Sequence, residues 1–430
     1  MTMINRDYYL NKLISKKQNG MVKIITGIRR CGKSVLLFDL FYEHLIKDGV
    51  KEDHIIKIKL DERTQVALRN PNTLCDYVAG IVRGKTEPYF ILIDEIQLLE
   101  RIGVEGTSSQ IGLYEVLNEL NGYKNTDVYV TGSNSKMLSS DIATEFRGRG
   151  DQLRIHPLSF REFYDAYSGD KRDAFHEFAV FGGMPYLFSL KNDAEKSAYL
   201  KELVDKVYLS DIVERNNLKK DTVVLGELLD VVASSTGSLT SPAKITNTFK
   251  TVYGGRGSLN TVNHYLDCFK DAFLVSEAKR YDIRGRSYID SPKKLYFEDL
   301  GLRNARLGFR EQDFSHIMEN IVYNELIRRG YNVDVGVIDH SFRDESGKKQ
   351  KRRLEIDFIC NLFDNRIYIQ SAYMIQDEEK RDQETRGFKR INDSFRKIVV
   401  TRDTFHPWKD ENGFLYVGIE SFLLNEEFMK

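Results

Sequence analysis

The sequence predicts an α/β protein that begins with a parallel β-sheet core, continues through a mostly helical middle region, and ends in a second α/β domain. Three observations lead to this prediction. Short apolar strands alternate with helical stretches in the first third of the chain. Three helices and a hairpin follow near the middle, and the last third combines an amphipathic helix with strand-like alternation. A length of 430 residues accommodates two or three domains.

Composition narrows the class of protein. Hydrophobic residues make up 41% of the chain and charged residues 30%, as is typical of a globular protein with packed cores. Lysine plus arginine number 64, as do aspartate plus glutamate, which argues against bulk electrostatic binding to nucleic acid or membrane but leaves room for a local basic patch. The sequence has no apolar run of transmembrane length, and residues 1–17 lack the apolar block of a secretory signal. We therefore expect a cytoplasmic protein with no membrane partner.

The first third of the chain carries the signal for the parallel sheet. Alternation of strands and helices implies a parallel sheet with helices on both faces. A further strand is indicated at Gln152–His156, and Pro157 ends it. The expected strands are Val22–Thr26, His54–Leu60, Tyr89–Asp94 and Asp127–Thr131, and the expected helices are Lys33–Leu45, Thr73–Val82 and Gly112–Leu120.

The remaining two thirds show two different patterns. Residues 160–218 are helical, with a break at Gly182-Gly183-Met184-Pro185. Three helices and then a hairpin follow, which is the winged-helix pattern. These are Thr222–Ser234, Pro242–Val252 and Leu259–Phe269, with hairpin strands Leu274–Arg280 and Lys294–Glu298. From about Phe314 onward an amphipathic helix, strands near residues 354–358, 366–372 and 397–401, and a polar helix at 376–391 indicate a second α/β domain.

The strongest functional motif is a phosphate-binding loop at residues 27–34, which fits G-x-x-x-x-G-K-[ST] at each defined position. Its glycines let backbone N–H groups face phosphates, and the helix N-terminus adds a favourable dipole. We expect Lys33 to reach the β- and γ-phosphates and the Ser34 hydroxyl to ligate Mg²⁺. The predicted cofactors are therefore ATP and Mg²⁺. The predicted nucleotide-binding residues are Gly27, Arg29, Arg30, Cys31, Gly32, Lys33, Ser34 and Val35. Arg29 and Arg30 either touch phosphate or lie exposed.

An apolar strand ending in Asp94-Glu95 supports the phosphate loop independently. It predicts a buried central strand that delivers carboxylates to the edge where ligands bind in open α/β sheets. We expect Asp94 to hold Mg²⁺ or its water and Glu95 to polarise the attacking water. The alternative is that Glu95 is an exposed strand end.

Two further catalytic candidates follow the next strand. Asn134, or its neighbour Ser133, is expected to contact the γ-phosphate or the water, unless it only caps a helix. Arg147, ahead of Arg149, is the candidate arginine finger that reaches the nucleotide of a neighbouring subunit, unless it lies in a solvated loop. A finger of this kind would require a homo-oligomer.

At these residues the chain resembles AAA-type P-loop ATPases, in particular a bacterial and archaeal group with a C-terminal domain of unknown function. The segments that carry the resemblance are 27–34, Ile93–Gln97, Thr131–Ser135, Pro157–Phe163, Gly182–Pro185 and Tyr208–Arg215. It implies an AAA core at residues 1–157, a helical lid segment at 158–218, a winged-helix domain at 219–310, and a restriction-endonuclease-like α/β domain at 311–430.

Nucleases of the implied C-terminal fold use carboxylates to hold a divalent metal and a lysine to assist the attacking water. Glu319 and Asp357 match two of the acidic positions, but Gln370 stands where glutamate is expected and Ala372 where lysine is expected. Glutamine cannot supply an anionic ligand. We therefore predict a degenerate domain that does not cleave, in which Glu319 and Asp357 are edge carboxylates or helix partners.

DNA is the candidate macromolecular partner. Residues 348–353, Lys-Lys-Gln-Lys-Arg-Arg, either track a phosphate backbone or form a solvated hairpin tip. The hairpin arginines Arg280, Arg284 and Arg286, and the polar residues Asn260, Asn263 and His264, are further candidates, although winged helices also serve as packing modules.

Three hypotheses for the whole chain follow. The first is an ATPase that couples hydrolysis to a conformational change acting on a partner. The second is a non-hydrolysing ATP sensor that acts as a scaffold, and the third is an ATP-gated nuclease.

Overall fold

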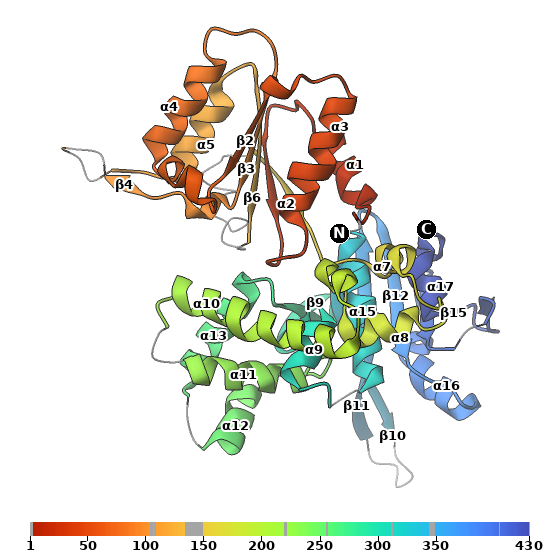
Figure 1. Cartoon of the computed structure of the whole chain (residues 1–430). Coiled ribbons are helices and arrows are strands. Elements are labelled where there is room, and N and C mark those ends of the chain that lie inside the picture. Colours follow the sequence, from red (N-terminus) through yellow and green to blue (C-terminus); the bar gives the residue numbers. More distant parts are fainter. Residues whose placement is uncertain are drawn as a thin grey trace. The chain divides into compact units, whose positions relative to one another are not determined.

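The computed structural model describes residues 3–103, 106, 109–133, 149–218, 222–254, 257–310, 313–343, 349–403 and 405–429. Two compact units make up the chain (Figure 1). The first comprises Met1–Pro157 together with Asp271–Phe273, and the second comprises Leu158–Lys270 and Leu274–Lys430. Among the described residues, no helix is long and apolar enough to cross a membrane.

The first unit contains a five-stranded, fully parallel sheet in the order β2-β3-β6-β1-β7. Its strands are β1 (Val22–Thr26), β2 (Ile55–Lys59), β3 (Tyr89–Asp94), β6 (Thr126–Gly132) and β7 (Gly150–Arg154). This confirms the predicted parallel α/β core. Because β6 lies between β1 and β3, the ends of these three strands meet at one edge of the sheet.

Helices cover both faces of this sheet, as the alternating sequence pattern predicts. In Figure 1, α4 (Pro71–Val82) and α5 (Leu113–Gly122) lie on one face, and α1 (Asp7–Ser15), α2 (Lys33–Val35) and α3 (Tyr42–Lys47) lie on the other. A π-helical stretch, η1 (Leu36–Phe41), joins α2 to α3. The apolar residues of β1 and β3 are almost fully buried, so the loops after them rest on a rigid support.

The second unit begins with helices and ends with an eight-stranded mixed sheet. The helices before the sheet are α7 (Phe160–Ala166), α8 (Ala174–Phe181), α9 (Asp193–Glu202), α10 (Ser210–Arg215), α11 (Thr222–Ser234), α12 (Pro242–Tyr253) and α13 (Leu259–Asp271). Later in the chain come α14 (Leu300–Arg306), α15 (Phe314–Arg328), α16 (Glu378–Thr385) and α17 (Ile419–Leu424).

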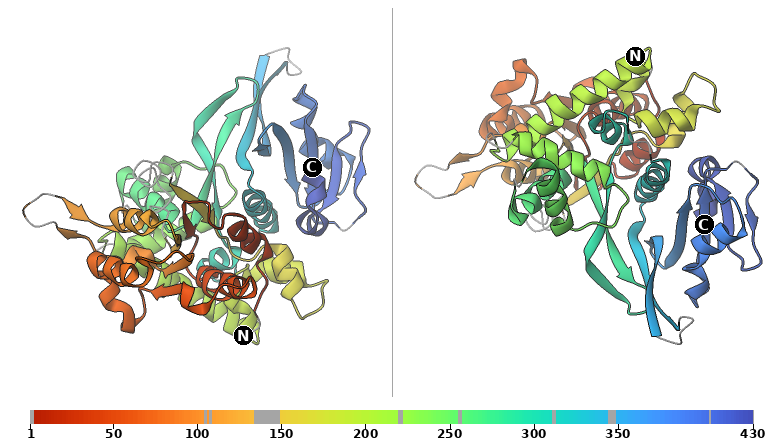
Figure 2. Two further views of the ribbon diagram at one scale, coloured as in Figure 1. Left: turned by 90° about the horizontal axis from the view of Figure 1, so that it is seen from above. Right: turned by 90° about the horizontal axis from the view of Figure 1, so that it is seen from below.

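The sheet of the second unit has the order β14-β15-β13-β12-β11-β10-β8-β9. Figure 2 shows its long hairpins from two sides. Its strands are β8 (Val275–Asp282), β9 (Ser287–Phe297), β10 (Asn332–Arg343), β11 (Lys349–Leu362), β12 (Asn365–Ala372), β13 (Arg396–Thr401), β14 (Trp408–Lys409) and β15 (Leu415–Gly418). The hairpin β8–β9 does not stand apart as a wing, because β8 pairs in parallel with β10. The domain boundary expected at residue 310 therefore falls within one continuous sheet.

The Gly182-Gly183 break in the helical region is a tight turn around the carboxylate of Asp299. Gly182 has φ 76°, and a Cβ there would lie 2.3 Å from Asp299 Oδ1. The Asp299 carboxylate accepts hydrogen bonds from the N–H groups of Gly183 (2.7 Å) and Leu302 (3.2 Å). The Gly183 carbonyl accepts a hydrogen bond from Leu158 N. Glycine is required here because a side chain would collide with Asp299.

The basic residues predicted to contact DNA differ in their exposure and in their partners. Arg280 is only 2% exposed, so it is buried within β8, and its proposed contact with DNA is wrong. Arg284 is exposed but donates to the carbonyls of Asp339 and Arg390. In the basic run 348–353, Lys348 lies outside the described residues, and Arg353 pairs with Asp339 at 2.9 Å.

Candidate functional site

The loop that follows β1 has the backbone of a tight cradle. Gly27 has φ 151° and a Cβ there would lie 2.1 Å from the carbonyl oxygen of Ile155, so only glycine fits. Arg30 and Gly32 also take positive φ values, of 63° and 101°. Positive φ is cheap for glycine and costly for arginine, so the loop is held in a specific conformation at Arg30.

Lys33, the first residue of α2, is buried at the centre of this cradle. It is 4% exposed, and its ammonium donates to the carbonyls of Gly27 (3.0 Å) and Ile28 (3.1 Å). These two carbonyls are its only partners among the residues that the structure describes. A buried cation without a counter-charge is electrostatically incomplete, and an anionic ligand would complete it.

The carboxyl end of β3 brings acidic groups to the same edge of the sheet. Asp94 is buried, and its carboxylate accepts a hydrogen bond from the hydroxyl of Thr131 on β6. The same hydroxyl accepts a hydrogen bond from Glu95 N at 3.1 Å. Glu95 adopts a left-handed conformation, with φ 51° and ψ 46°. Such backbone strain in a non-glycine residue is typical of functional sites. Thr131 therefore fixes both consecutive acids.

Gln97 orients the Glu95 side chain. Its amide donates to the Glu95 carboxylate and approaches the hydroxyl of Ser133 at 3.4 Å. Ser133, at the end of β6, is 2% exposed. Gln97, which lies in the same turn as Glu95, thus connects the Glu95 carboxylate to Ser133 at the end of β6.

The segment after β7 is fastened across the phosphate loop. Arg6, which is 4% exposed at the start of α1, donates to the carbonyl of Cys31 at 3.0 Å and to the carbonyl of His156 at 2.7 Å. The thiol of Cys31 contacts the Ile155 carbonyl at 3.6 Å, and Tyr9 accepts from His156 N at 3.3 Å. We call residues Ile155–Pro157 the strap. Arg6 thus links the phosphate loop to the strap through hydrogen bonds to both.

The residues of this site fit a magnesium nucleotide. Lys33 lacks an anionic partner, the loop amides begin a helix, and Ser34 and Asp94 supply the hydroxyl and carboxylate oxygens that Mg²⁺ prefers. Lys33 and the loop backbone would hold the phosphates, and Ser34 and Asp94 would hold the metal. Bound Mg²⁺ would neutralise charge that develops on the phosphates.

The structure brings most of the predicted site residues together at one edge. Arg29, Arg30 and Val35 have exposed side chains, whereas Cys31 is fully buried. Asn134 and Arg147 lie outside the described residues, so their predicted roles remain predictions. Arg149 is described and exposed.

Sequence reasoning missed three residues of the site, namely Thr131, Gln97 and Arg6. The position of Thr131 at the end of a strand next to the acidic strand was a usable signal. Gln97 stands two residues after Glu95, within reach of it on a tight turn. Arg6 lies 150 residues from His156, so no local pattern could have found that contact.

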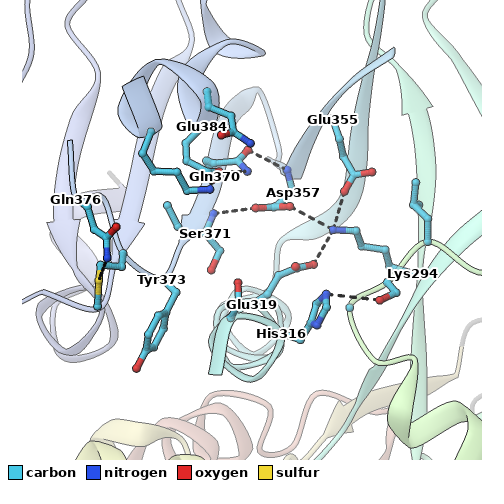
Figure 3. Close-up of a pocket in the computed structure, with 18 of the residues that line it drawn as sticks. Lys294, His316, Glu319, Glu355, Asp357, Gln370, Ser371, Tyr373, Gln376 and Glu384 are labelled. Atoms are coloured by element: carbon cyan, nitrogen blue, oxygen red, sulfur yellow. Dashed lines mark hydrogen bonds and ion pairs between the residues drawn. The ribbon is translucent and has the colours of Figure 1, made fainter. Parts of the chain in front are cut away.

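A second polar cluster lies in the second unit, in a pocket of about 940 Å³ (Figure 3). Lys294 on β9 forms ion pairs with Glu319 on α15 (2.8 Å), and with Glu355 (2.8 Å) and Asp357 (3.2 Å) on β11. Glu319 and Asp357 are 7% and 6% exposed. Of the two roles predicted for them, edge carboxylate or helix partner, the first is wrong, because Asp357 lies on β11 between β10 and β12 and Glu319 lies on a helix. Burial raises the pKa of Glu319 to about 7, although the Lys294 ammonium opposes that rise.

Comparisons with known proteins support the AAA-type core of the first unit. A family model described as an AAA domain matches residues 19–164, and one described as a domain of unknown function (DUF8612) matches residues 172–313. An uncharacterised protein of Haemophilus influenzae is 33% identical over 427 residues, which cover 98% of this chain and 99% of that protein. An uncharacterised protein of Methanocaldococcus jannaschii is 28% identical over 406 residues, which cover 90% of this chain and 81% of that protein.

Among solved structures, a Walker-type ATPase of Pyrococcus abyssi is similar to this chain at 15% sequence identity and a TM-score of 0.49. The match covers 71% of this chain and 96% of that chain.

Proposed function

This chain belongs to the AAA-type P-loop ATPases, and from that premise we propose that it hydrolyses ATP to ADP and phosphate with Mg²⁺ as cofactor. The observation that carries the proposal is the meeting of Lys33, Asp94 and Glu95 at one sheet edge. Lys33 is a buried cation without a counter-charge, and two consecutive acids stand at the end of β3 and in the turn that follows it. A triphosphate would supply the counter-charge that Lys33 lacks.

Each residue has a distinct part in the proposed reaction. Lys33 would leave the carbonyls of Gly27 and Ile28 to bind the phosphates, and Ser34 and Asp94 would hold the metal. Glu95 orients the attacking water and accepts its proton. In this proposal, Asn134 contacts the γ-phosphate, and Arg147 completes the site of a neighbouring subunit.

Steady-state phosphate release by wild type and Glu95→Gln tests the assignment. We expect wild type to turn over, and the variant to bind a fluorescent ATP analogue with unchanged affinity but to lose turnover. Glu100→Gln, an exposed acid on the same segment, is the matched control and should behave as wild type. Equal turnover by wild type and Glu95→Gln would contradict the assignment. Tight binding with no turnover by wild type would favour the sensor and scaffold hypothesis.

We further propose that the strap carries the nucleotide state out of the ATPase core. When Lys33 releases the carbonyls of Gly27 and Ile28, the loop must rearrange around Cys31, whose carbonyl is bonded to Arg6. Arg6 also holds His156, which stands one residue before the end of the first unit. ATP binding therefore pulls on the segment that leads into the second unit.

Hydrogen exchange of the peptide that spans residues 150–160, with and without ATP, tests the coupling. We expect ATP to change exchange in wild type, and Arg6→Gln to lose that change while still binding ATP. Asn11→Ala, an exposed substitution on the same helix, should retain the wild-type response. An ATP response that persists unchanged in Arg6→Gln would exclude Arg6 as the link.

The proposed partner is DNA, bound by the three helices α11, α12 and α13, while the hairpin β8–β9 stays part of the large sheet through its pairing with β10. Asn260, Asn263 and His264 have exposed side chains on α13, where amide and imidazole groups suit base edges. Fluorescence anisotropy with duplex DNA is the test. We expect Asn260→Ala with Asn263→Ala to weaken binding, and the exposed substitution Asn11→Ala to leave it unchanged. Binding that is equal in all three proteins would exclude α13 as the reading helix.

The proposed finger, Arg147, requires neighbouring subunits. Mass measurement in solution with and without ATP should therefore show assembly in ATP. A monomer in both conditions, together with full ATPase activity, would exclude a finger that acts between subunits.

A further inference from the structure

The pocket around Lys294 is lined by strands β9, β11 and β12, by helices α12, α15 and α16, and by the loops beside them. Strand β9 supplies Lys294, helix α15 supplies Glu319, strand β11 supplies Glu355 and Asp357, and strand β12 lines the far side. In Figure 3 the three carboxylates turn toward a single point, and the Lys294 ammonium occupies that point. The lysine is 3% exposed, so its charge is balanced from within the protein.

The geometry around the ammonium is complete. An ammonium has three N–H donors, and each of the three carboxylates lies within 3.2 Å of it. The carboxylates are themselves held in place. Tyr296 donates to Glu319 Oε1 at 2.5 Å, and the backbone N–H of Ser371 donates to Asp357 Oδ2 at 2.9 Å. Such supporting hydrogen bonds are what a cation-binding site uses to orient its ligands.

The charges at this centre are those of a divalent-cation site with one unit of charge missing. Three carboxylates around one ammonium carry a formal charge of minus two, and a divalent ion in place of the ammonium would leave minus one. The hydroxyl of Ser371 is also buried in the pocket wall without a hydrogen-bond partner. Yet among the described residues, no group of acidic, histidine or cysteine side chains is arranged to hold a metal ion. The ammonium stands where that ion would be.

We infer that Lys294 is a built-in cation that replaces a divalent metal, so that the centre in the second unit is metal-independent and joins β9 to α15 and β11. The metal expected by analogy with nucleases does not fit, because its place is taken. The inference does not depend on ATP hydrolysis, since each of these residues belongs to the second unit.

Removal of the ammonium should uncover the latent site. Lys294→Met leaves three carboxylates facing one another, and Mn²⁺ should then bind with one equivalent per chain and raise the melting temperature by several degrees. Wild type without nucleotide should show neither effect. The full chain is used throughout, in an Asp94→Asn background so that metal at the phosphate loop does not contribute.

Further variants make each outcome of the test informative. Lys293→Met removes the neighbouring lysine, which faces the other side of the strand and pairs with Glu277, and it should show no response to Mn²⁺. Lys294→Gln is a milder substitution that serves if Lys294→Met does not fold, and it should also gain Mn²⁺ binding. Adding Glu319→Gln to either Lys294 variant should weaken the metal response. If neither Lys294 variant binds Mn²⁺, or if nucleotide-free wild type binds it and Asp357→Asn abolishes that binding, the inference is overturned.

Discussion

Lys33 and Lys294 are both buried ammonium groups at sheet edges, but their surroundings are opposite. Lys33 contacts two backbone carbonyls and has no carboxylate partner among the described residues, whereas Lys294 contacts three carboxylates. Lys33 thus has no negative group beside its ammonium, whereas Lys294 has an excess of negative charge around it. A buried lysine with too little negative charge around it marks a place for an anionic ligand. A lysine surrounded by carboxylates is itself the ligand. The groups around each ammonium therefore indicate its role: an ammonium without carboxylate partners binds an anion, and one with three carboxylate partners serves as their cation.

The largest expected effect is the loss of ATP turnover on substitution of Lys33, which substitution of Lys294 should not reproduce. Lys33→Met should lower ATP turnover by roughly 100- to 1000-fold, because a positive group that faces the transferred phosphate is removed. It should not lower the free energy of unfolding in the absence of nucleotide, because an ammonium buried without a counter-charge opposes folding rather than favouring it. Phosphate release and urea denaturation without nucleotide measure the two quantities. A large loss of stability would mean that Lys33 has a structural partner that the structure does not reveal.

Lys294→Met should have the reverse effect. Without the ammonium, three carboxylates repel one another in a largely buried place, and breaking such a buried charge pair costs roughly 3–5 kcal/mol of folding free energy. Affinity for ATP should not change, because Lys294 and its partners lie in the second unit. Urea denaturation and titration with a fluorescent ATP analogue check both statements. Lys293→Met, on the opposite side of β9, is the control and should cost less than about 1 kcal/mol.

Asp299 extends the comparison to a buried acid whose carboxylate is held by backbone N–H groups. Burial raises its pKa to about 6, and the hydrogen bonds from Gly183 and Leu302 oppose that rise. The folded-state pKa lies above the usual value of 3.8, so the folded state keeps a proton that the unfolded chain releases. Its contribution to stability is therefore greatest below about pH 4 and falls as the pH rises to about 6, by up to roughly 3 kcal/mol.

Unfolding free energies of wild type and Asp299→Asn, measured between pH 4 and pH 6.5, test this dependence. The difference between the two proteins should change with pH in that window and be flat above it. Asn cannot accept from both N–H groups, so the variant should be less stable at every pH. A difference that is constant across the window would show that the Asp299 carboxyl titrates as it does in the unfolded chain.

Local pattern predicted much of the ATPase core and little of the second centre. The phosphate loop and the strand that ends in Asp94-Glu95 are short, contiguous segments, and parallel pairing brings their ends together. Glu319 and Asp357 were singled out and are indeed close to each other. Their cation was missed because Lys294 lies 25 and 63 residues from them in the sequence. A contact between three separate elements leaves no periodic signal in the sequence. Gln370 and Ala372 indicate only that the glutamate and the lysine of the nuclease pattern are absent, and they do not indicate which residue is the cation.

The smallest expected effect on turnover concerns the orientation of the Glu95 carboxylate. Gln97 holds the Glu95 carboxylate through its amide and approaches Ser133. Gln97→Leu should lower turnover by about 10-fold without changing ATP affinity, because a catalytic base loses the hydrogen bond that orients it. Gln97→Glu should lower turnover further, since a like charge would face Glu95. Leu98→Ala, in the same turn, is exposed and should leave turnover unchanged. If Gln97→Leu raises turnover instead, Gln97 restrains Glu95 in a resting state. Glu95 would then have to leave Gln97 before it could act as a base, just as Lys33 has to leave its two carbonyls before it can bind phosphate.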